Sequence, residues 1–169
     1  ANSAYTLKDI DLFKEMDQYQ LQYIEQPLGE EDIVDHAVLQ KEIETPVCLD
    51  ESVVSYEAAE AAIRLGSCKV INIKSSRCGG VYEGKRIHDL CVAHGIPVWC
   101  GGMTELGIGR AQNVSFASLP GFTELAHDVA AANRYFDEDI TSPIVDITDR
   151  CTIIVPDEDN GIRYEVDET

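Results

Sequence analysis

The sequence predicts an α/β fold, the C-terminal part of an incomplete TIM-type (β/α) barrel followed by a short β-containing extension. Two observations predict it. Short apolar runs end at positions 24, 49, 73 and 99, which is a period of about 25 residues. Patterns typical of helices fill the gaps between these runs. Strands and helices that alternate at these lengths indicate βα units and a parallel sheet.

The four apolar runs have the composition of strands that are buried on both faces. They are short, rich in β-branched residues and almost continuously apolar, as expected of a parallel sheet covered by helices. They span residues 21–24, 46–49, 70–73 and 96–99, and a weaker candidate spans 122–125.

The predicted helices carry local start and stop signals. Thr6 and Asp9 can form a capping box at the start of the first helix. Ser55 can cap the third helix, and Gly66 can end it. The five predicted helices span residues 7–18, 32–43, 56–65, 81–94 and 106–118.

The barrel is expected to be incomplete, because a full barrel has eight βα units. Extending the period backwards predicts another strand end just before Ala1, so we expect the chain to be part of a longer protein. We assign residues 1–126 to the partial barrel and residues 127–169 to an extension outside the barrel wall. In this extension the patterns predict two short strands at 144–147 and 151–155, then a turn at 157–161 that is followed by residues 162–166.

Composition narrows the function classes. The 169 residues carry a formal charge of −18, which argues against binding to nucleic acids or to anionic membranes. No apolar run reaches the roughly 20 residues that span a bilayer, and no signal-peptide pattern is found. The six cysteines form no C-x-x-C pair and the four histidines have no zinc spacing, so we expect free thiols in a reducing cytoplasm.

Three ionisable residues directly follow three successive predicted strands: Glu25, Asp50 and Lys74. Parallel α/β proteins place their chemistry at the carboxyl ends of strands, so these side chains are expected to share one face of the sheet. Each residue alone could be a capping or solvated surface charge. Their recurrence at the same position of the repeat favours a common site.

The three residue types suit one kind of chemistry. Two carboxylates can hold a hard divalent cation such as Mg²⁺ or Mn²⁺. The nearby cation and burial would both favour a neutral lysine, which can remove a proton alpha to a carboxylate. The metal would then stabilise the negative charge that develops on the substrate.

Several motifs resemble the enolase superfamily, for which a lysine base with magnesium is the known arrangement. Residues 23–28 (YIEQPL), 49–52 (LDES) and 72–80 (NIKSSRCGG) resemble strand ends of its muconate-lactonizing branch. Residues 99–110 (WCGGMTELGIGR) discriminate further and resemble the o-succinylbenzoate synthase and N-acylamino acid racemase group, as does NRYF at 133–136.

The resemblance implies a role for each matching residue. Glu25 and Asp50 would bind magnesium, and Lys74 would be one of two acid/base lysines. The remaining implied site residues are Gly101, Gly102 and Met103 in the substrate pocket, and Asn2 and Glu51 as supports of the metal ligands.

The implied activity is that of a magnesium-dependent carbon–oxygen lyase of the o-succinylbenzoate synthase type, which dehydrates a small carboxylate substrate in menaquinone biosynthesis. The alternatives are an N-acylamino acid racemase or related epimerase, and a non-catalytic barrel fragment. The family's first metal-ligand aspartate would stand just before Ala1, and its Lys-x-Lys motif and capping domain lie still earlier. We therefore expect these residues to need the missing N-terminal half for turnover, and their open sheet edges to favour homo-oligomers.

Overall fold

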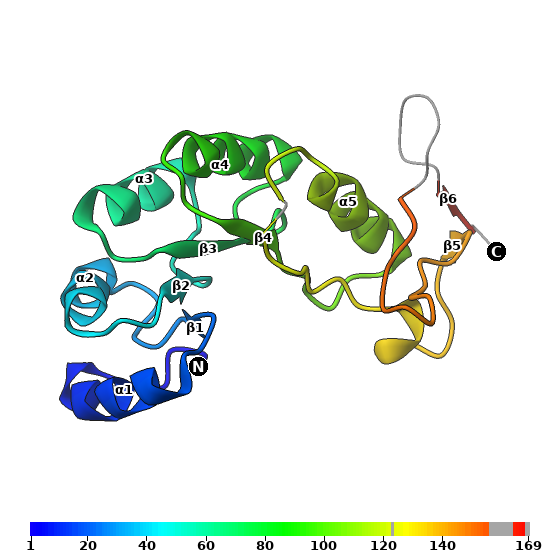
Figure 1. Cartoon of the computed structure of the whole chain (residues 1–169). Coiled ribbons are helices and arrows are strands. Elements are labelled where there is room, and N and C mark those ends of the chain that lie inside the picture. The colour runs from blue at the N-terminus through cyan, green and yellow to red at the C-terminus, as the bar shows by residue number, and fades with distance from the viewer. Residues whose placement is uncertain (123, 156–163, 168–169) are drawn as a thin grey trace. The chain divides into compact units, whose positions relative to one another are not determined.

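The computed structural model describes residues 1–122, 124–155 and 164–167 (Figure 1). The chain divides into two compact units, Ala1–Val98 and Trp99–Thr169. In the described ranges, no helix combines the length and the apolar character that crossing a membrane requires.

Parallel strands form one layer of the first unit. Ile24 pairs with Val47, and Cys48 pairs with Val70, both in parallel register. The amide of Ile71 donates to the carbonyl of Pro97 (3.1 Å), which ties the third strand to the segment leading into the fourth. The strands are β1 (Ile24–Glu25), β2 (Val47–Leu49), β3 (Val70–Ile73) and β4 (Val98–Cys100), in the order β1-β2-β3-β4. All four strands expected from the period are confirmed.

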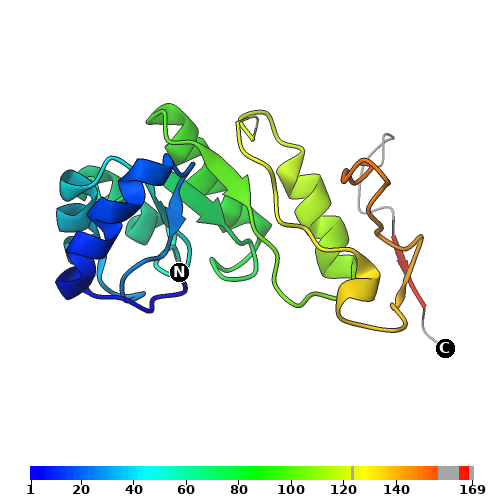
Figure 2. The same ribbon diagram turned by 60° about the horizontal axis from the view of Figure 1, so that its bottom comes forward.

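The helices of the first unit all lie on one face of this sheet (Figures 1 and 2). Thr6 and Asp9 form the expected capping box. The predicted first helix is a helical run of three pieces, η1 (Leu7–Asp9), α1 (Ile10–Met16) and η2 (Asp17–Tyr19). The others are α2 (Ile33–Glu42), α3 (Tyr56–Leu65) and α4 (Val81–Ala93).

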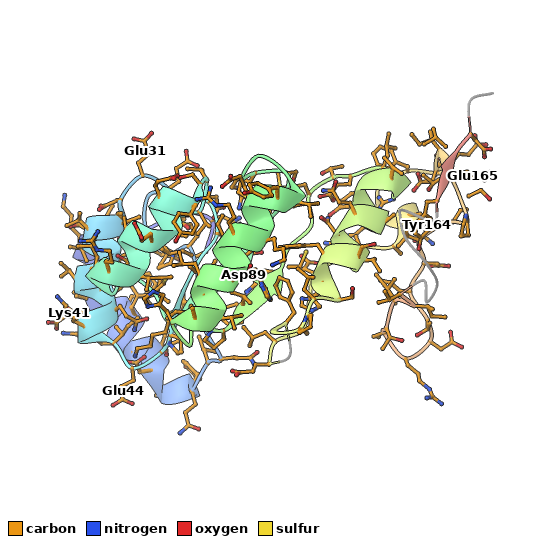
Figure 3. The ribbon with its side chains drawn as sticks, turned by 90° about the horizontal axis from the view of Figure 1, so that it is seen from above. Glu31, Lys41, Glu44, Asp89, Tyr164 and Glu165 are labelled. Carbon is orange, nitrogen blue, oxygen red and sulfur yellow. The ribbon has the colours of Figure 1, made fainter. Side chains whose placement is uncertain are left out.

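The core of the first unit lies between the helices and the sheet. Phe13, Leu39 and Ile87 from the helices are buried, as are Leu49 and Ile71 from the strands. Burying one such side chain stabilises the fold by roughly 1.5–3 kcal/mol. Charged side chains point the other way: Glu31, Lys41 and Glu44 extend outward from this unit (Figure 3).

The second unit is built around α5 (Gly107–Ala117). Ala111 and Val114 of this helix pack against Val145, and Val129 and Ile153 cover the cluster. The remaining elements are η3 (Ala132–Arg134) and the antiparallel pair β5 (Thr141–Ser142) and β6 (Glu165–Val166).

The strand predictions after residue 120 are largely wrong. The described residues of 122–125 form no strand, and neither do 144–147 or 151–155. Their apolar side chains resemble a strand pattern, but Val145 and Ile153 pack on α5 instead of pairing with a neighbouring strand. A strand does form at Glu165–Val166, in the segment that follows the predicted turn. The predicted turn at 157–161 lies outside the described residues.

One parallel bridge joins Gly101 to Asp128. The amide of Asp128 donates to the carbonyl of Cys100 (3.1 Å), and the amide of Gly102 donates to the carbonyl of Asp128 (2.8 Å). Residues 127–128 thus run beside the end of β4. The predicted boundary between residues 126 and 127 falls next to this bridge and stays a prediction.

Candidate active site

The carboxyl ends of the first three strands carry the three predicted ionisable residues. Glu25 is the last residue of β1, Asp50 directly follows β2, and Lys74 directly follows β3. Because these strands are parallel and adjacent, their ends meet at one edge of the sheet. The three side chains are therefore brought together within the first unit.

Asp50 is the centre of a buried charge cluster. Its side chain is 3% exposed, and its Oδ2 lies 2.8 Å from Nζ of Lys74. Nη1 of Arg77 donates to the other carboxylate oxygen. Arg77 lies in the turn after β3, where its amide donates to the carbonyl of Lys74 (2.9 Å). Two cationic side chains thus neutralise Asp50, as a buried carboxylate requires.

Glu25 is in a different electrostatic environment. Its half-buried carboxylate accepts a hydrogen bond from Nδ2 of Asn72 (3.0 Å). Burial raises the pKa of Glu25, and the negative charge of Asp50 raises it further; the Asn72 bond and Lys74 act in the opposite direction. An additional cation near Glu25 and Asp50 would relieve both effects that raise this pKa.

The predicted supporting residues contact each other. Nδ2 of Asn2 lies 3.5 Å from Oε1 of Glu51, the residue after Asp50. The amino terminus of Ala1 donates to the backbone carbonyl of Glu25. The first residues of the chain therefore lie beside the strand-end carboxylates, although support of a metal by Asn2 and Glu51 stays a prediction.

The three predicted pocket residues belong to the second unit. The amide of Gly102 donates a hydrogen bond to the carbonyl of Asp128. A Cβ at Gly102 would lie 2.9 Å from the same carbonyl oxygen. Met103 is 45% exposed, and its amide donates to Oε2 of Glu105 (2.7 Å). Gly101 forms the parallel bridge to Asp128. Their role in binding a substrate stays a prediction.

The donor set fits a hard divalent cation. Glu25 and Asp50 supply carboxylate oxygens, which Mg²⁺ and Mn²⁺ prefer. Oδ1 of Asn72 is buried beside them and has no hydrogen-bond partner among the described residues. Within those residues, no group of three or more acidic, histidine or cysteine side chains is placed to hold a metal. Two carboxylates usually bind Mg²⁺ together with water or substrate oxygens.

The sequence interpretation missed two residues of this site, Arg77 and Asn72. Asn72 could have been found, because it lies two residues before Lys74 and side chains at that spacing share one face of a strand. Arg77 gave no comparable signal. It reaches Asp50 because the turn after β3 folds back on itself, with the amide of Cys78 also donating to the Lys74 carbonyl (3.2 Å).

Comparison with known proteins shows which family this chain resembles in sequence. The sequence profile of the family described as "Enolase C-terminal domain-like" matches residues 1–169. An o-succinylbenzoate synthase from Bacillus subtilis (strain 168) is 58% identical over 147 residues, which cover 87% of this chain and 39% of that protein. An N-succinylamino acid racemase from Amycolatopsis sp. is 55% identical over 145 residues, 86% of this chain and 39% of that protein.

A solved structure agrees with the sequence comparison. A member of the enolase superfamily from Listeria innocua Clip11262 superposes with a TM-score of 0.92 at 44% identity, covering 99% of this chain and 44% of that one. The chain thus spans about two fifths of the length of the curated relatives that it matches.

Proposed function

Because this chain belongs to the enolase C-terminal domain-like family, we propose that it is the C-terminal part of an o-succinylbenzoate synthase-type lyase. The reaction removes a proton alpha to a carboxylate and then eliminates water, as a step of menaquinone biosynthesis in the cytoplasm. The observation that carries the proposal is the convergence of Glu25, Asp50 and Lys74 at adjacent strand ends.

Lys74 is the acid/base in this proposal. Its side chain is 14% exposed, so it can meet a substrate while remaining largely shielded from water. In its neutral form Nζ takes the alpha proton, and the resulting ammonium is held beside Asp50. Asn72 keeps the Glu25 carboxylate oriented from the neighbouring strand.

Glu25 and Asp50 would hold Mg²⁺, or Mn²⁺ in its place. The bound cation would supply positive charge to the substrate carboxylate. A third protein ligand and the second lysine would come from the N-terminal half of the longer enzyme, which we propose as the main partner of these residues. The substrate is a small carboxylate.

A racemase is the second candidate. One specific observation favours it: relatives named synthase and relatives named racemase match this chain at similar identity. Both activities begin with removal of the same kind of proton, so Lys74, Glu25 and Asp50 serve either one. They differ in whether water leaves or the proton returns on the opposite face.

The test is proton exchange in D₂O by the longer protein that contains these residues. With Mg²⁺ present, proton NMR follows loss of the alpha-proton signal of an N-succinylamino acid and of the o-succinylbenzoate precursor. We expect Lys74→Ala to slow this exchange by roughly 100- to 10,000-fold, the usual contribution of a general acid or base. Product formation from each compound separates lyase from racemase.

Lys85→Ala is the matched control. Lys85 also forms an ion pair with an aspartate, Asp89, but on the exposed surface of α4. Lys85→Ala should leave the rate of alpha-proton exchange unchanged. Equal rates in the Lys74 variant and the unmodified protein would refute the proposal. Absence of exchange with every substrate in the longer protein would favour a non-catalytic barrel.

A further inference from the structure

One buried glutamine connects the strand ends that carry the two carboxylates. Gln26 directly follows Glu25 and is fully buried. Its Oε1 accepts hydrogen bonds from the amide of Asp50 (3.0 Å) and from the amide of Ser52 (3.2 Å). Its Nε2 donates to Oγ of Ser52 (2.8 Å). A single side chain just after β1 therefore accepts from two backbone amides in the turn after β2.

The backbone of Gln26 is also unusual. Its φ of 37° lies in a region that residues other than glycine seldom adopt. Its own amide donates to the carbonyl of Cys48 (2.8 Å), and its carbonyl accepts from the amide of Ser3 (2.8 Å). The surrounding hydrogen bonds hold the residue in this conformation, which is typical of positions where a site imposes the local geometry.

We propose that Gln26 is the positioning residue that fixes the Asp50 carboxylate relative to the Glu25 carboxylate, and thereby sets the affinity for a divalent cation. The proposal rests on the proposed function, because it assumes that these two residues bind the metal. Groups that orient metal ligands typically change metal affinity by roughly 10- to 100-fold when they are removed.

The competing interpretation is that Gln26 only stabilises the fold, and Gln40 provides a matched control. Gln40 is also buried, its Oε1 accepts from the amide of Val47 (2.7 Å), and its Nε2 donates to the carbonyl of Thr45 (3.3 Å). Gln40 thus holds the amino-terminal end of β2, whereas Gln26 holds the turn at its carboxyl-terminal end.

The experiment compares Gln26→Met with Gln40→Met in the longer protein that contains these residues. Methionine keeps the approximate length and volume of glutamine but removes both hydrogen-bonding groups. Two quantities are measured: the Kd for Mn²⁺ by electron paramagnetic resonance, and amide exchange by NMR in the metal-free protein. Ser52→Ala is a milder third variant, which removes the Oγ partner of Gln26 Nε2 and the hydrogen bond from that Oγ to the carbonyl of Glu30 (2.6 Å) but leaves the amide bonds to Gln26 Oε1 in place.

We expect Gln26→Met to weaken Mn²⁺ binding by roughly 10- to 100-fold, and Ser52→Ala to weaken it by less. Gln40→Met should leave the Kd within about threefold. In the metal-free protein, exchange of the Asp50 and Ser52 amides should accelerate about tenfold in Gln26→Met alone, and exchange of the Val47 amide in Gln40→Met alone.

Each outcome supports or overturns the positioning role of Gln26. Equal loss of Mn²⁺ affinity in both methionine variants would overturn the positioning role, as would an unchanged Kd in Gln26→Met. If Gln26→Met does not fold, the Kd of Ser52→Ala relative to Gln40→Met decides in the same way. If the unmodified longer protein binds no Mn²⁺, the proposed metal site fails separately, and the exchange of the Asp50 and Ser52 amides still shows whether Gln26 holds that turn.

Discussion

At the scale of single residues, Glu25 and Asp50 show how two neighbouring carboxylates differ. Asp50 has Lys74 and Arg77 as ionic partners. Glu25 has the neutral Asn72 as its side-chain donor and is half-buried, so burial raises its pKa. The site is therefore asymmetric, and ionised Glu25 is the group that a cation would stabilise.

Glu25→Gln should raise the urea midpoint of the metal-free chain at pH 7. The folded chain binds the Glu25 proton more tightly than the unfolded chain, so stability falls as pH rises from the ordinary value of 4.5 through the raised folded pKa. The ionised carboxylate carries this cost, and a neutral amide at position 25 removes it. Measured with EDTA, an unchanged or lower midpoint contradicts this; Glu31→Gln, on the outer surface, is the control (Figure 3).

His36 gives the opposite pH dependence. Burial lowers its pKa, and Nε2 of the ring accepts a hydrogen bond from the amide of Leu28 (3.1 Å), which requires the neutral form. The unfolded chain therefore binds more protons below the ordinary value of 6.5, and this contribution to stability is lost as pH falls through that value toward the lower folded pKa.

His36→Gln should reduce the loss of unfolding free energy between pH 7.5 and pH 5.5, as measured by urea titration at the two pH values. His94→Gln, at an exposed position, should leave that loss unchanged. An identical pH dependence in both variants would exclude His36 as the cause. His127 accepts from the amide of Cys100 (3.0 Å) and also has a pKa lowered by burial, so some dependence should persist in His36→Gln.

At the scale of elements, local sequence signals were sufficient in the first unit. Oγ of Ser55 accepts from the amide of Ala58 (3.2 Å) at the start of α3, and Gly66 ends the helix with a φ of 72°. The bounds of α3 match the prediction because both ends are set by side chains or backbone within a few residues.

The second unit depends instead on a distant contact. Arg110 of α5 and Asp139 form an ion pair of 2.7 Å with both side chains 1% exposed. Asp139 also accepts from the amide of Gly107 (2.8 Å). A Cβ at Gly107 would lie 1.8 Å from Oγ1 of Thr141, so the glycine permits the close approach of helix and tail.

Asp139→Asn should cost about 3–5 kcal/mol of unfolding free energy, because it leaves the buried Arg110 charge without its partner. Adding Arg110→Met to this variant should restore part of the loss. The exposed pair of Lys85 and Asp89 is the control, and Asp89→Asn should cost less than about 1 kcal/mol. Urea unfolding checks all three, and a cost for Asp139→Asn as small as the control would show that the ion pair is unimportant.

At the scale of the whole molecule, the prediction concerns association. Open edges of a parallel sheet present unpaired backbone groups that a second chain can bind. We expect dimers or larger species of this chain alone, measured by light scattering, and fewer of them when the N-terminal half is added. A stable monomer at high concentration would contradict this prediction. The charge of −18 opposes association, so added salt should increase it.

The sequence by itself determined the βα order, the four strands and the placement of Glu25, Asp50 and Lys74. These follow from short-range patterns, because apolar periodicity and strand-end position are fixed by neighbouring residues. Only the tertiary structure decided that Arg77 joins the site, that Gln26 connects two strand ends, and that Asp139 is the partner of Arg110. Such contacts depend on the path of the backbone between distant segments, and no local pattern specifies that path. For the same reason, the strand predictions at 144–147 and 151–155 are wrong: an apolar pattern does not show which segment these residues contact. Val145 is buried, whereas Ile144 and Ile154 are exposed.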